Sequence, residues 1–197
     1  MLRLVARLTA RARLPVRFSR GYNPRPALSL AWPRPVGVAT LCDLLVMTLD
    51  EPPEGRSPDA AELVSRLGET APEGLRFLRA EPLAGRSAPL PRRMDYERPL
   101  AKETADRLRR RLAELASRDR WPARRQARPG KARAGEEGEF DIRPLVNDVR
   151  VEETTLRWSH VPGGGKWARP GELLNLLGLC EQADLSAVTR TGLEYGQ

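Results

Sequence analysis

Residues 21–26, with the sequence GYNPRP, combine side chains suited to recognising a ligand. The two prolines restrict the backbone and the glycine can adopt a positive φ, so this segment is predicted to be a loop that holds its side chains in fixed directions. Tyr22 can then stack on a base, with Asn23 beside it, while Arg25 binds a phosphate or a carboxylate. The alternative is a connecting loop in which Arg25 pairs with Asp141 or another acid.

Two further motifs contain charged groups. Asp141 and Arg143 flank Ile142 in an expected strand, where alternation puts both charged side chains on one face as a ligand-binding pair or a structural salt bridge. Residues 163–165 are three glycines followed by Lys166. This run lacks the GxxxxGK[ST] spacing of a phosphate-binding loop, so a glycine hairpin tip carrying Lys166 is the commoner interpretation.

Positive charge is concentrated in two blocks of the chain, which has a formal net charge of +8. Residues 1–42 hold eight Arg and no acidic residue, and residues 107–133 hold eleven basic and two acidic side chains. Such blocks predict a polyanion surface, because clustered arginines neutralise phosphates and release counterions. The residues expected to contribute are Arg17, Arg20, Arg124 and Arg125, with the 107–111 cluster and Arg128, Lys131 and Arg133. The alternative is a coding bias, since 31 of the 34 basic residues are Arg.

Cysteine and histidine are too scarce for several kinds of site. Cys42 and Cys180 are the only cysteines and His160 is the only histidine, which excludes a zinc finger, an all-cysteine iron–sulfur site and a disulfide framework. We expect no metal and no cofactor, two inert buried thiols, and a surface or packing role for His160. The low cysteine content and the lack of a long apolar run predict a cytoplasmic protein without membrane contact.

The elements that must position these residues fall into two halves, 1–84 and 93–197. In the first half, an amphipathic helix from Leu2 ends at Pro15 and residues 16–19 form a short strand-like piece. The remaining expected elements are strands at 27–32 and 42–49, a helix capped by Ser57 and running to about Thr70, and a strand at 75–82. Residues 83–92 are expected to be a linker.

The second half repeats this order. The expected elements are a strand at 94–100, a helix from Ala101 to Leu115, a strand at 123–127, a hairpin tip at 128–138, strands at 139–146 and 154–161, a helix at 170–179 and a strand at 187–195. Strand-helix-strand-strand-helix-strand is the order of a ferredoxin-like plait. The predicted fold class is therefore α+β, as two tandem ferredoxin-like plaits, the first lacking its initial strand.

Several motifs together resemble a bacterial family, the radical-SAM-linked family of uncharacterised proteins. The matching pieces are the GYNPRP loop, PRPVGV at 33–38, PEGL at 72–75, DIRPL at 141–145 and RPGEL at 169–173. The resemblance implies association with a cobalamin-binding radical SAM protein. Members usually begin with a strand and a Ser-His-Leu-Asp entry into the first helix, whereas this chain starts inside that helix. Two cysteines cannot supply the three cluster ligands of radical SAM chemistry, so that chemistry is expected in the partner.

The leading functional prediction is a non-catalytic accessory protein of a radical SAM enzyme that binds RNA or a ribonucleoprotein. One alternative is an RNA-processing or RNA-modifying enzyme, although a single histidine leaves no clear acid–base pair. Another is a structural partner whose basic face docks on an acidic protein.

Overall fold

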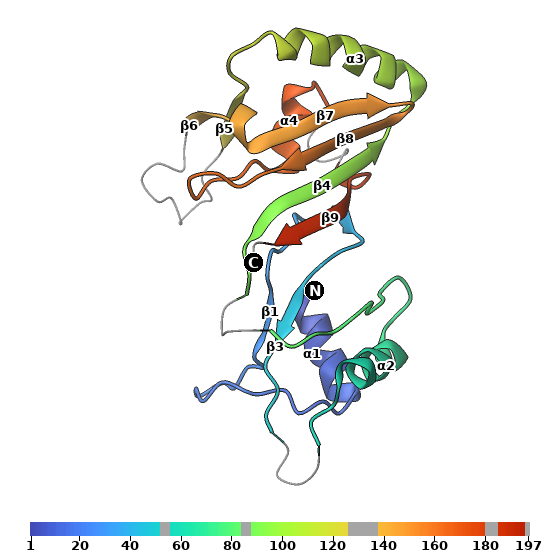
Figure 1. Cartoon of the computed structure of the whole chain (residues 1–197), viewed down its shortest axis with the longest axis vertical. Helices are drawn as coiled ribbons and strands as arrows, with labels where there is room; N and C mark the ends of the chain where they lie inside the picture. The colour runs from blue at the N-terminus through green and yellow to red at the C-terminus, as the bar shows by residue number, and fades with distance from the viewer. Residues whose placement is uncertain (52–55, 84–87, 126–137, 180–184, 196–197) are drawn as a thin grey trace. The chain divides into compact units, whose positions relative to one another are not determined.

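The computed structural model describes residues 1–51, 56–83, 88–125, 138–179 and 185–195 (Figure 1). The chain is a mixed α+β protein that divides into two compact units. Unit 1 comprises residues 1–31 and 44–88, and unit 2 comprises residues 32–43 and 89–197. The chain therefore leaves unit 1 after Ala31, contributes a segment to unit 2, and returns at Leu44.

Unit 1 is built from two helices and a small sheet. Its elements are α1 (Leu2–Arg11), β1 (Leu28–Leu30), β3 (Leu45–Met47) and α2 (Ala60–Thr70), with β1 and β3 antiparallel. Leu8 of α1 and Leu67 of α2 are buried in one cluster, together with Leu14 and Val16. Apolar residues at helical spacing thus produce the two helices, because each buries one stripe in this core.

Helix α1 ends through its own backbone and through an arginine of α2. Arg13 adopts a left-handed φ of 49°, and the backbone N–H of Leu14 donates to the carbonyl of Thr9. Arg66 then donates to the carbonyl oxygen of Ala12 at 2.6 and 3.0 Å and to that of Arg13 at 2.7 Å. These carbonyls have no partner within the helix, so a cation at this end satisfies them and also interacts favourably with the helix dipole.

Two expectations for unit 1 need correction. The N-cap of α2 is Asp59, whose carboxylate accepts from the backbone N–H of Glu62 at 2.9 Å, and not Ser57. Residues 75–82 form no strand, although Leu75 and Phe77 pack against the core. Alternating apolar residues are compatible with a strand, but a strand also needs a neighbour to pair its backbone, and no strand among the described residues pairs with this segment.

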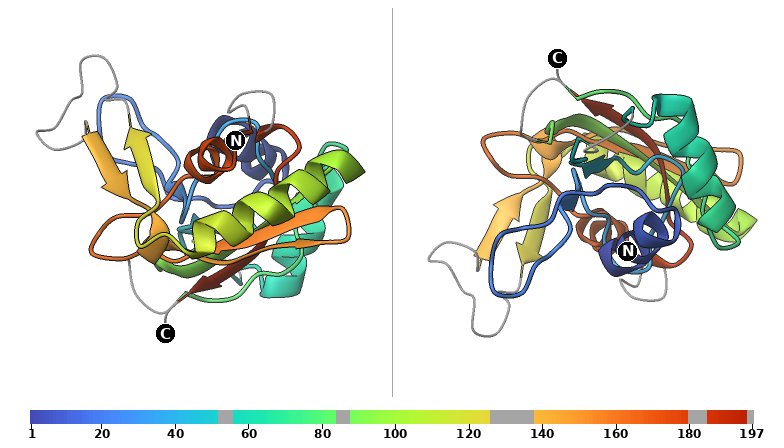
Figure 2. Two further views of the ribbon diagram at one scale, coloured as in Figure 1. Left: turned by 90° about the horizontal axis from the view of Figure 1, so that it is seen from above. Right: turned by 90° about the horizontal axis from the view of Figure 1, so that it is seen from below.

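Unit 2 contains most of the regular structure. Its strands are β2 (Ala39–Thr40), β4 (Pro91–Pro99), β5 (Pro122–Arg125), β6 (Gly138–Asp141), β7 (Val146–Glu152), β8 (Thr155–His160) and β9 (Thr189–Tyr195). Its helices are α3 (Lys102–Ala116), the short 3-10 helix η1 (Arg143–Leu145) and α4 (Pro170–Leu176). Five strands form one sheet in the order β2-β9-β4-β8-β7. β5 pairs with β6 in a separate ribbon (Figure 2).

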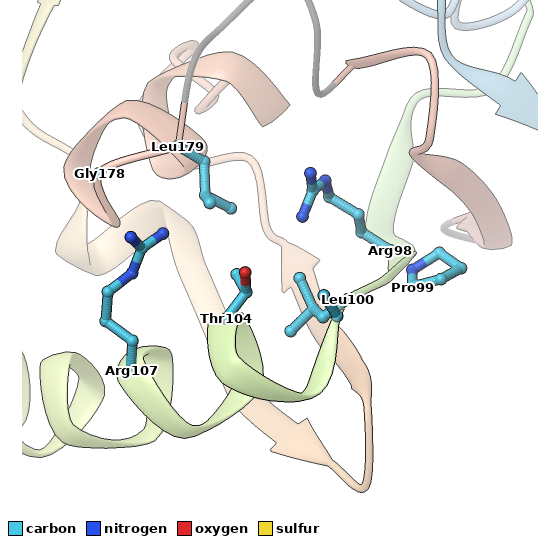
Figure 3. A pocket seen from close by; sticks show the side chains of 8 residues that line it. Arg98, Pro99, Leu100, Thr104, Arg107, Gly178 and Leu179 are labelled. Atoms are coloured by element: carbon cyan, nitrogen blue, oxygen red, sulfur yellow. The ribbon is translucent and has the colours of Figure 1, made fainter.

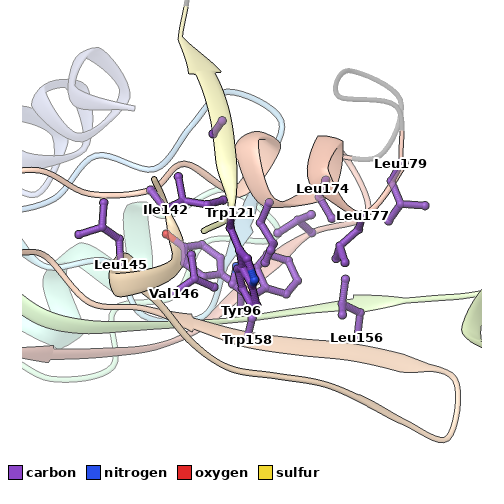
Figure 4. Packing of buried hydrophobic residues seen from close by; sticks show 14 of the residues in the cluster. Tyr96, Trp121, Ile142, Leu145, Val146, Leu156, Trp158, Leu174, Leu177 and Leu179 are labelled. Carbon is purple, nitrogen blue, oxygen red and sulfur yellow. The ribbon is translucent and has the colours of Figure 1, made fainter. Parts of the chain in front are cut away.

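The core of unit 2 lies between this sheet and helices α3 and α4. Tyr96 of β4 and Trp158 of β8 stack with their ring centroids 5.4 Å apart, and both are almost completely buried. Leu108 of α3 and Leu173 of α4 belong to the same cluster, in which Tyr96 and Trp158 are central (Figure 4). Both helices therefore cover the same face of the sheet, and its other face carries polar side chains.

The strand predicted at 139–146 is wrong in its second half. β6 ends at Asp141, and residues 143–145 turn into η1 before the separate strand β7 begins. Asp141 accepts from the backbone N–H of Arg143 at 3.0 Å, which favours a turn at this point. Asp141 and Arg143 are consequently not neighbours on one strand face, although Ile142 does lie fully buried in the core. The hairpin tip expected at 128–138 lies almost entirely outside the described residues.

The strand-helix-strand-strand-helix-strand order occurs once among the described residues. β4-α3-β7-β8-α4-β9 follow it, their sheet order is β9-β4-β8-β7, and every neighbouring pair of these four strands is antiparallel. β2 extends this sheet by pairing parallel to β9. Unit 1 shows no comparable sheet in its described residues. The expectation of two tandem plaits is therefore not confirmed.

Replacing Arg66 tests the end of α1. Arg66→Ala should lower the free energy of unfolding by about 1–3 kcal/mol, because a charged donor of several hydrogen bonds is lost. Amide hydrogen exchange should rise most in the last turn of α1, and urea denaturation followed by circular dichroism measures the total. Arg56→Ala is the control, since the ion pairs of Arg56 with described residues, Asp59 and Glu62, are exposed. Equal effects of the two variants would contradict a capping role.

Candidate nucleic-acid interface

Residues 17–26 form a closed loop, called here the aromatic–basic loop. Phe18 and Pro26 form an isolated β-bridge at its base. Beyond them, the backbone N–H of Ser19 donates to the carbonyl of Arg25 at 2.8 Å, and the backbone N–H of Arg25 donates to Oγ of Ser19 at 2.9 Å. These contacts hold the two ends of the loop next to each other, so the loop is closed by its own hydrogen bonds.

The tip of the aromatic–basic loop exposes an aromatic side chain. Tyr22 is fully exposed, with a relative accessibility of 101%, and Asn23 beside it is also exposed. Phe18 at the base is 55% exposed. Gly21 does not adopt the positive φ that its residue type permits, and a Cβ added there would meet no atom within 4 Å. The prolines and the Ser19–Arg25 hydrogen bonds, and not a left-handed glycine, therefore define the loop.

The arginines of this loop differ in their partners. Arg17 donates from Nε to Oδ1 of Asp50 at 2.6 Å, and both side chains are more than half exposed. Arg20 and Arg25 are exposed, and neither forms an ion pair with any described residue. The predicted pairing of Arg25 with Asp141 does not occur in the described structure, where Asp141 accepts backbone N–H groups of Trp121 and Arg143. Two guanidinium groups thus remain available at this loop.

Arg124 and Arg125 are adjacent in β5 but have different environments. Arg125 donates to both carboxylate oxygens of Glu172 at 2.8 and 3.0 Å and to the carbonyl of Trp167 at 3.0 Å. Its guanidinium also lies over the ring of Phe140, 4.6 Å from the centroid. Arg124 is 88% exposed and lies 3.9 Å from a carboxylate oxygen of Glu139. Arg125 therefore fastens the β5–β6 ribbon to α4, whereas Arg124 faces solvent.

The other predicted site residues of unit 2 occupy separate positions. Arg143 is partly exposed and lies 3.8 Å from a carboxylate oxygen of Asp119. Lys166 is exposed and closes a tight turn, in which its backbone and that of Gly163 exchange two hydrogen bonds of 2.9 Å. Gly164 and Gly165 have φ values of 57° and 73°, as this turn requires. The glycine run is thus a hairpin tip and not a phosphate-binding loop.

Some arginines of the 107–111 cluster are paired with acidic side chains of the described residues, and others are not. Arg109 donates to Asp106 at 2.6 Å and also contacts the carbonyl of Glu153, and Arg111 lies 3.1 Å from Glu114. Arg107 and Arg110 are exposed and have no ion pair with the described residues. Of the more C-terminal basic residues, Arg128, Lys131 and Arg133 lie outside the described residues.

The face of the large sheet opposite α3 and α4 carries a network of ion pairs, which was not predicted from the sequence. Arg93 contacts Asp95 and Asp148, both at 2.8 Å, and Ser159 donates to Asp95 at 2.7 Å. Arg157 lies 3.6 Å from Glu97, and the same network continues through Glu152 and Arg150. A shallow cavity of about 300 Å³ lies over this face. The four carboxylates and three guanidinium groups of the network do not make a basic surface; the signal in the sequence is the alternation of opposite charges in β4, β7 and β8.

His160 is a packing residue. It is completely buried, Trp158 donates from Nε1 to its Nε2 at 3.1 Å, and the ring of Tyr96 lies 5.0 Å away. Burial lowers its pKa from 6.5 to about 3, so the ring is neutral. Its Nδ1 has no partner among the described residues. Because the side chain does not reach solvent, it cannot exchange protons with a substrate.

Cys42 lies beside a buried arginine that the sequence analysis also missed. Its thiol is half-buried and donates to the carbonyl of Arg190 at 3.7 Å, and burial raises its pKa. Arg190 is fully buried and donates to the carbonyl of Trp32 at 3.1 Å and to the carboxylate of Asp43. A raised pKa keeps the thiol protonated, as expected for an inert cysteine. Cys180 lies outside the described residues.

A bacterial protein family described as "uncharacterized protein conserved in bacteria (DUF2344)" matches residues 1–170. The chain belongs to this family. No curated protein and no solved structure matches the chain. In the described part of the chain, no helix has the length and apolar character needed to cross a membrane. The same residues contain no group of three His, Cys, Asp or Glu side chains arranged to hold a metal ion.

Replacing either of the two adjacent arginines of β5 should have different effects on the stability of unit 2. Arg125→Ala should lower the free energy of unfolding of unit 2 by about 3 kcal/mol, because the buried Glu172 would lose its cationic partner and keep only the hydrogen bond from the backbone N–H of Arg169. Arg124→Ala should change it by less than about 0.5 kcal/mol. All four tryptophans belong to unit 2, so tryptophan fluorescence during urea denaturation reports on this unit. Similar losses in both variants would contradict the assigned difference.

Burial of His160 predicts a pH dependence of stability. The pKa is about 3 in the folded protein and 6.5 in the unfolded chain, so between these values the unfolded chain binds the additional proton. Stability should therefore fall as pH decreases below 6.5, by up to about 1.4 kcal/mol per pH unit. His160→Gln retains an acceptor for Trp158 and should show a shallower fall in tryptophan-monitored denaturation from pH 7 to about pH 4. Parallel curves for the two proteins would contradict this.

Proposed function

We propose that this chain is a non-catalytic RNA-binding accessory protein of a radical SAM enzyme. The observation that carries the proposal is the aromatic–basic loop, where a fully exposed Tyr22 is accompanied by Arg20 and Arg25, neither ion-paired to a described residue. Residues 1–42 contain no acidic side chain that could compete for these guanidinium groups. An aromatic ring flanked by available cations is suited to an unpaired nucleotide.

The chemistry of the loop favours single-stranded RNA over a simple anion. Stacking of a base on an aromatic ring contributes about 1–3 kcal/mol, and each phosphate contact adds a salt-dependent increment. The Ser19–Arg25 hydrogen bonds order the loop before it binds, so less conformational entropy is lost on binding. Asn23 adds an amide that can donate to and accept from the edge of a base.

Unit 2 would contribute a scaffold and additional charge. We interpret its βαββαβ order as a ferredoxin-like plait extended by β2, and unit 1 as the incomplete partner of a tandem pair. The predicted domain boundaries of 1–84 and 93–197 differ from the two units, because residues 32–43 belong to unit 2. Arg124 and Lys166 are exposed, and Arg143 is partly so; they are candidates for electrostatic steering of RNA. Arg125 is not a candidate for this role, because its guanidinium forms an ion pair with Glu172.

The proposed partner is a radical SAM enzyme, which would carry out the chemistry. The support is the set of motifs that resembles the radical-SAM-linked family, together with the presence of only two cysteines, too few for a cluster with three cysteine ligands. A cytoplasmic location is part of the proposal, and the low cysteine content supports it. In this arrangement the chain presents the RNA, or a ribonucleoprotein, to the enzyme.

Binding to a fluorescent single-stranded RNA of about 12 nucleotides tests the proposal by anisotropy over a range of KCl concentrations. Arg20→Ala and Arg25→Ala should each weaken binding and each lower the slope of log K against log salt by about 1 or slightly less. Tyr22→Ala should weaken binding about fivefold or more without changing the slope, because stacking releases no counterion.

Arg56→Ala is the matched control, since Arg56 is an exposed arginine of unit 1 with acidic partners. It should retain the affinity and the slope of the wild-type protein. The proposal would be contradicted if the wild-type protein failed to bind RNA, or if the loop variants bound RNA as tightly as the wild type. Retention of a protein partner after nuclease treatment, with no RNA affinity, would instead favour the docking function.

A further inference from the structure

A pair of tryptophans in unit 2 lies outside the loop discussed above. The rings of Trp32 and Trp167 contact each other edge to face, with centroids 4.9 Å apart and planes 77° apart. Trp167 is 37% exposed, and Trp32 is partly buried against the core. The other two tryptophans, Trp121 and Trp158, are buried, with exposed fractions of 9% and 1%. The exposed indole surface of the chain is therefore concentrated at this pair.

The pair joins two of the motifs identified in the sequence. Trp32 immediately precedes PRPVGV at 33–38, and Trp167 lies two residues before RPGEL at 169–173. Neither motif belongs to the aromatic–basic loop. The contact between the two rings brings the starts of these motifs together within unit 2.

Residues 166–169, called here the tryptophan segment, are held by their backbone. Arg125 donates to the carbonyl of Trp167 at 3.0 Å, and the backbone N–H of Arg169 donates to Glu172 at 2.7 Å. Arg125 and Glu172 are themselves an ion pair, so both hydrogen bonds are made to the same buried group. Between them, Ala168 is buried with an exposed fraction of 1%. The segment is thus ordered before a ligand arrives, so less conformational entropy is lost on binding.

The tryptophan segment presents two cations beside the exposed ring. Lys166 precedes Trp167, and Arg169 follows it by two residues; both are exposed, and neither forms an ion pair with a described residue. Ala168 is buried, whereas Trp167 and Arg169 on either side of it face solvent. An aromatic surface and two available charges therefore occur within one ordered segment.

This combination fits a nucleotide better than a protein surface. Within residues 138–179, all of which are described, Trp167 is the one large apolar side chain that is exposed. A protein interface usually buries about 800 Å² on each partner around an apolar centre. A nucleotide needs less, because its base stacks on one ring and its phosphate contacts one or two cations. A bare anion would leave the indole uncovered.

We propose that Trp167 is a second stacking site for single-stranded RNA, in which a base lies on the indole and the adjoining phosphates contact Lys166 and Arg169. Trp32, packed against the core, supports the ring. This inference rests on the proposed function in taking RNA as the ligand. Its residues all belong to unit 2, and none of them lies in the aromatic–basic loop. Each unit then carries its own contact to RNA.

Tryptophan fluorescence of the full chain, titrated with an oligoadenylate of about four nucleotides, tests this site. A base stacked on Trp167 should quench part of the emission, while the buried Trp121 and Trp158 keep theirs. Trp167→Leu should remove this quenching. It should also weaken binding about fivefold or more, measured by the anisotropy of the same oligonucleotide carrying a fluorescent label, because the stacking surface is lost. Trp167→Phe, which retains a ring, should recover most of the affinity.

The two cations are tested separately from the ring. Lys166→Ala and Arg169→Ala remove exposed side chains and leave the core intact. Each should weaken binding and lower the slope of log K against log salt by about 1 or slightly less, because each removes one phosphate contact.

Arg107→Ala is the matched control for the two cations. Arg107 is an exposed arginine of unit 2 that forms no ion pair with a described residue. It lines a cavity of about 430 Å³ together with Gly178 and Leu179, which follow α4, whereas the tryptophan segment precedes α4 (Figure 3). None of the described residues that line this cavity is aromatic. The variant should therefore leave the quenching unchanged and weaken binding less than Lys166→Ala does.

Three results would overturn the proposal. One is the absence of quenching in the wild-type protein, and another is quenching that survives in Trp167→Leu. The third is an equal loss of affinity in Arg107→Ala and Lys166→Ala, which would indicate attraction to the overall charge of unit 2. Without quenching, a protein partner whose retention after nuclease treatment depends on Trp167 would assign this surface to protein docking.

Tyr22→Ala separates this site from the aromatic–basic loop. It should leave the quenching unchanged, because Tyr22 belongs to unit 1. Quenching in wild type together with loop variants that bind RNA normally would contradict the loop as an RNA site and leave the Trp167 site standing. Weakened binding in the loop variants without any quenching would contradict the Trp167 site alone.

Discussion

The architecture of unit 2 depends on one buried guanidinium. Arg190 of β9 is completely buried and donates to the carbonyl of Trp32 and to the carboxylate of Asp43. Trp32 and Asp43 are the first and last residues of the segment 32–43, which belongs to unit 2 although the residues before and after it belong to unit 1. A buried ion pair adds little net stability compared with apolar packing, but loss of one partner leaves an unpaired charge in the interior. Backbone hydrogen bonds pair β2 with β9, with the N–H of Leu41 donating to the carbonyl of Arg190 at 2.9 Å, and the contact between the Arg190 and Asp43 side chains holds the end of the same segment.

Arginine is used for two different purposes in this chain, and charge alone does not separate them. Arg66, Arg125 and Arg190 donate to carbonyls and carboxylates of the protein itself, where the planar fork of the guanidinium suits several acceptors at once. Arg25 and Arg107 have no such partner among the described residues. The high arginine content therefore reflects internal bonding as well as any interaction with anions, and only the geometry around each side chain distinguishes the two.

The sequence predicted the helices better than the strands. The apolar stripes of α1, α2 and α3 identified them because a helix buries one face whatever its neighbour is. β7 was missed because Asp141 starts a turn inside an apparently continuous strand, and residues 75–82 were assigned to a strand that has no partner. At the candidate site, the prolines predicted a loop but not its closure by the Ser19–Arg25 hydrogen bonds. The Arg125–Glu172 pair could not be foreseen either, because it joins residues 47 positions apart.

The distribution of aromatic residues limits where unit 2 can contact nucleic acid. A sheet that binds single strands through its open face needs aromatic rings on that face, on which bases can stack. Here Tyr96 and Trp158 point towards the helices, and the opposite face of the sheet carries paired Arg93, Asp95 and Arg157. A polyanion on this face would have to break those ion pairs and would face four carboxylates and three guanidinium groups. The RNA contacts proposed above are therefore expected at the aromatic–basic loop, at the tryptophan segment and at exposed arginines elsewhere, such as Arg110 of α3 and Arg124 of β5.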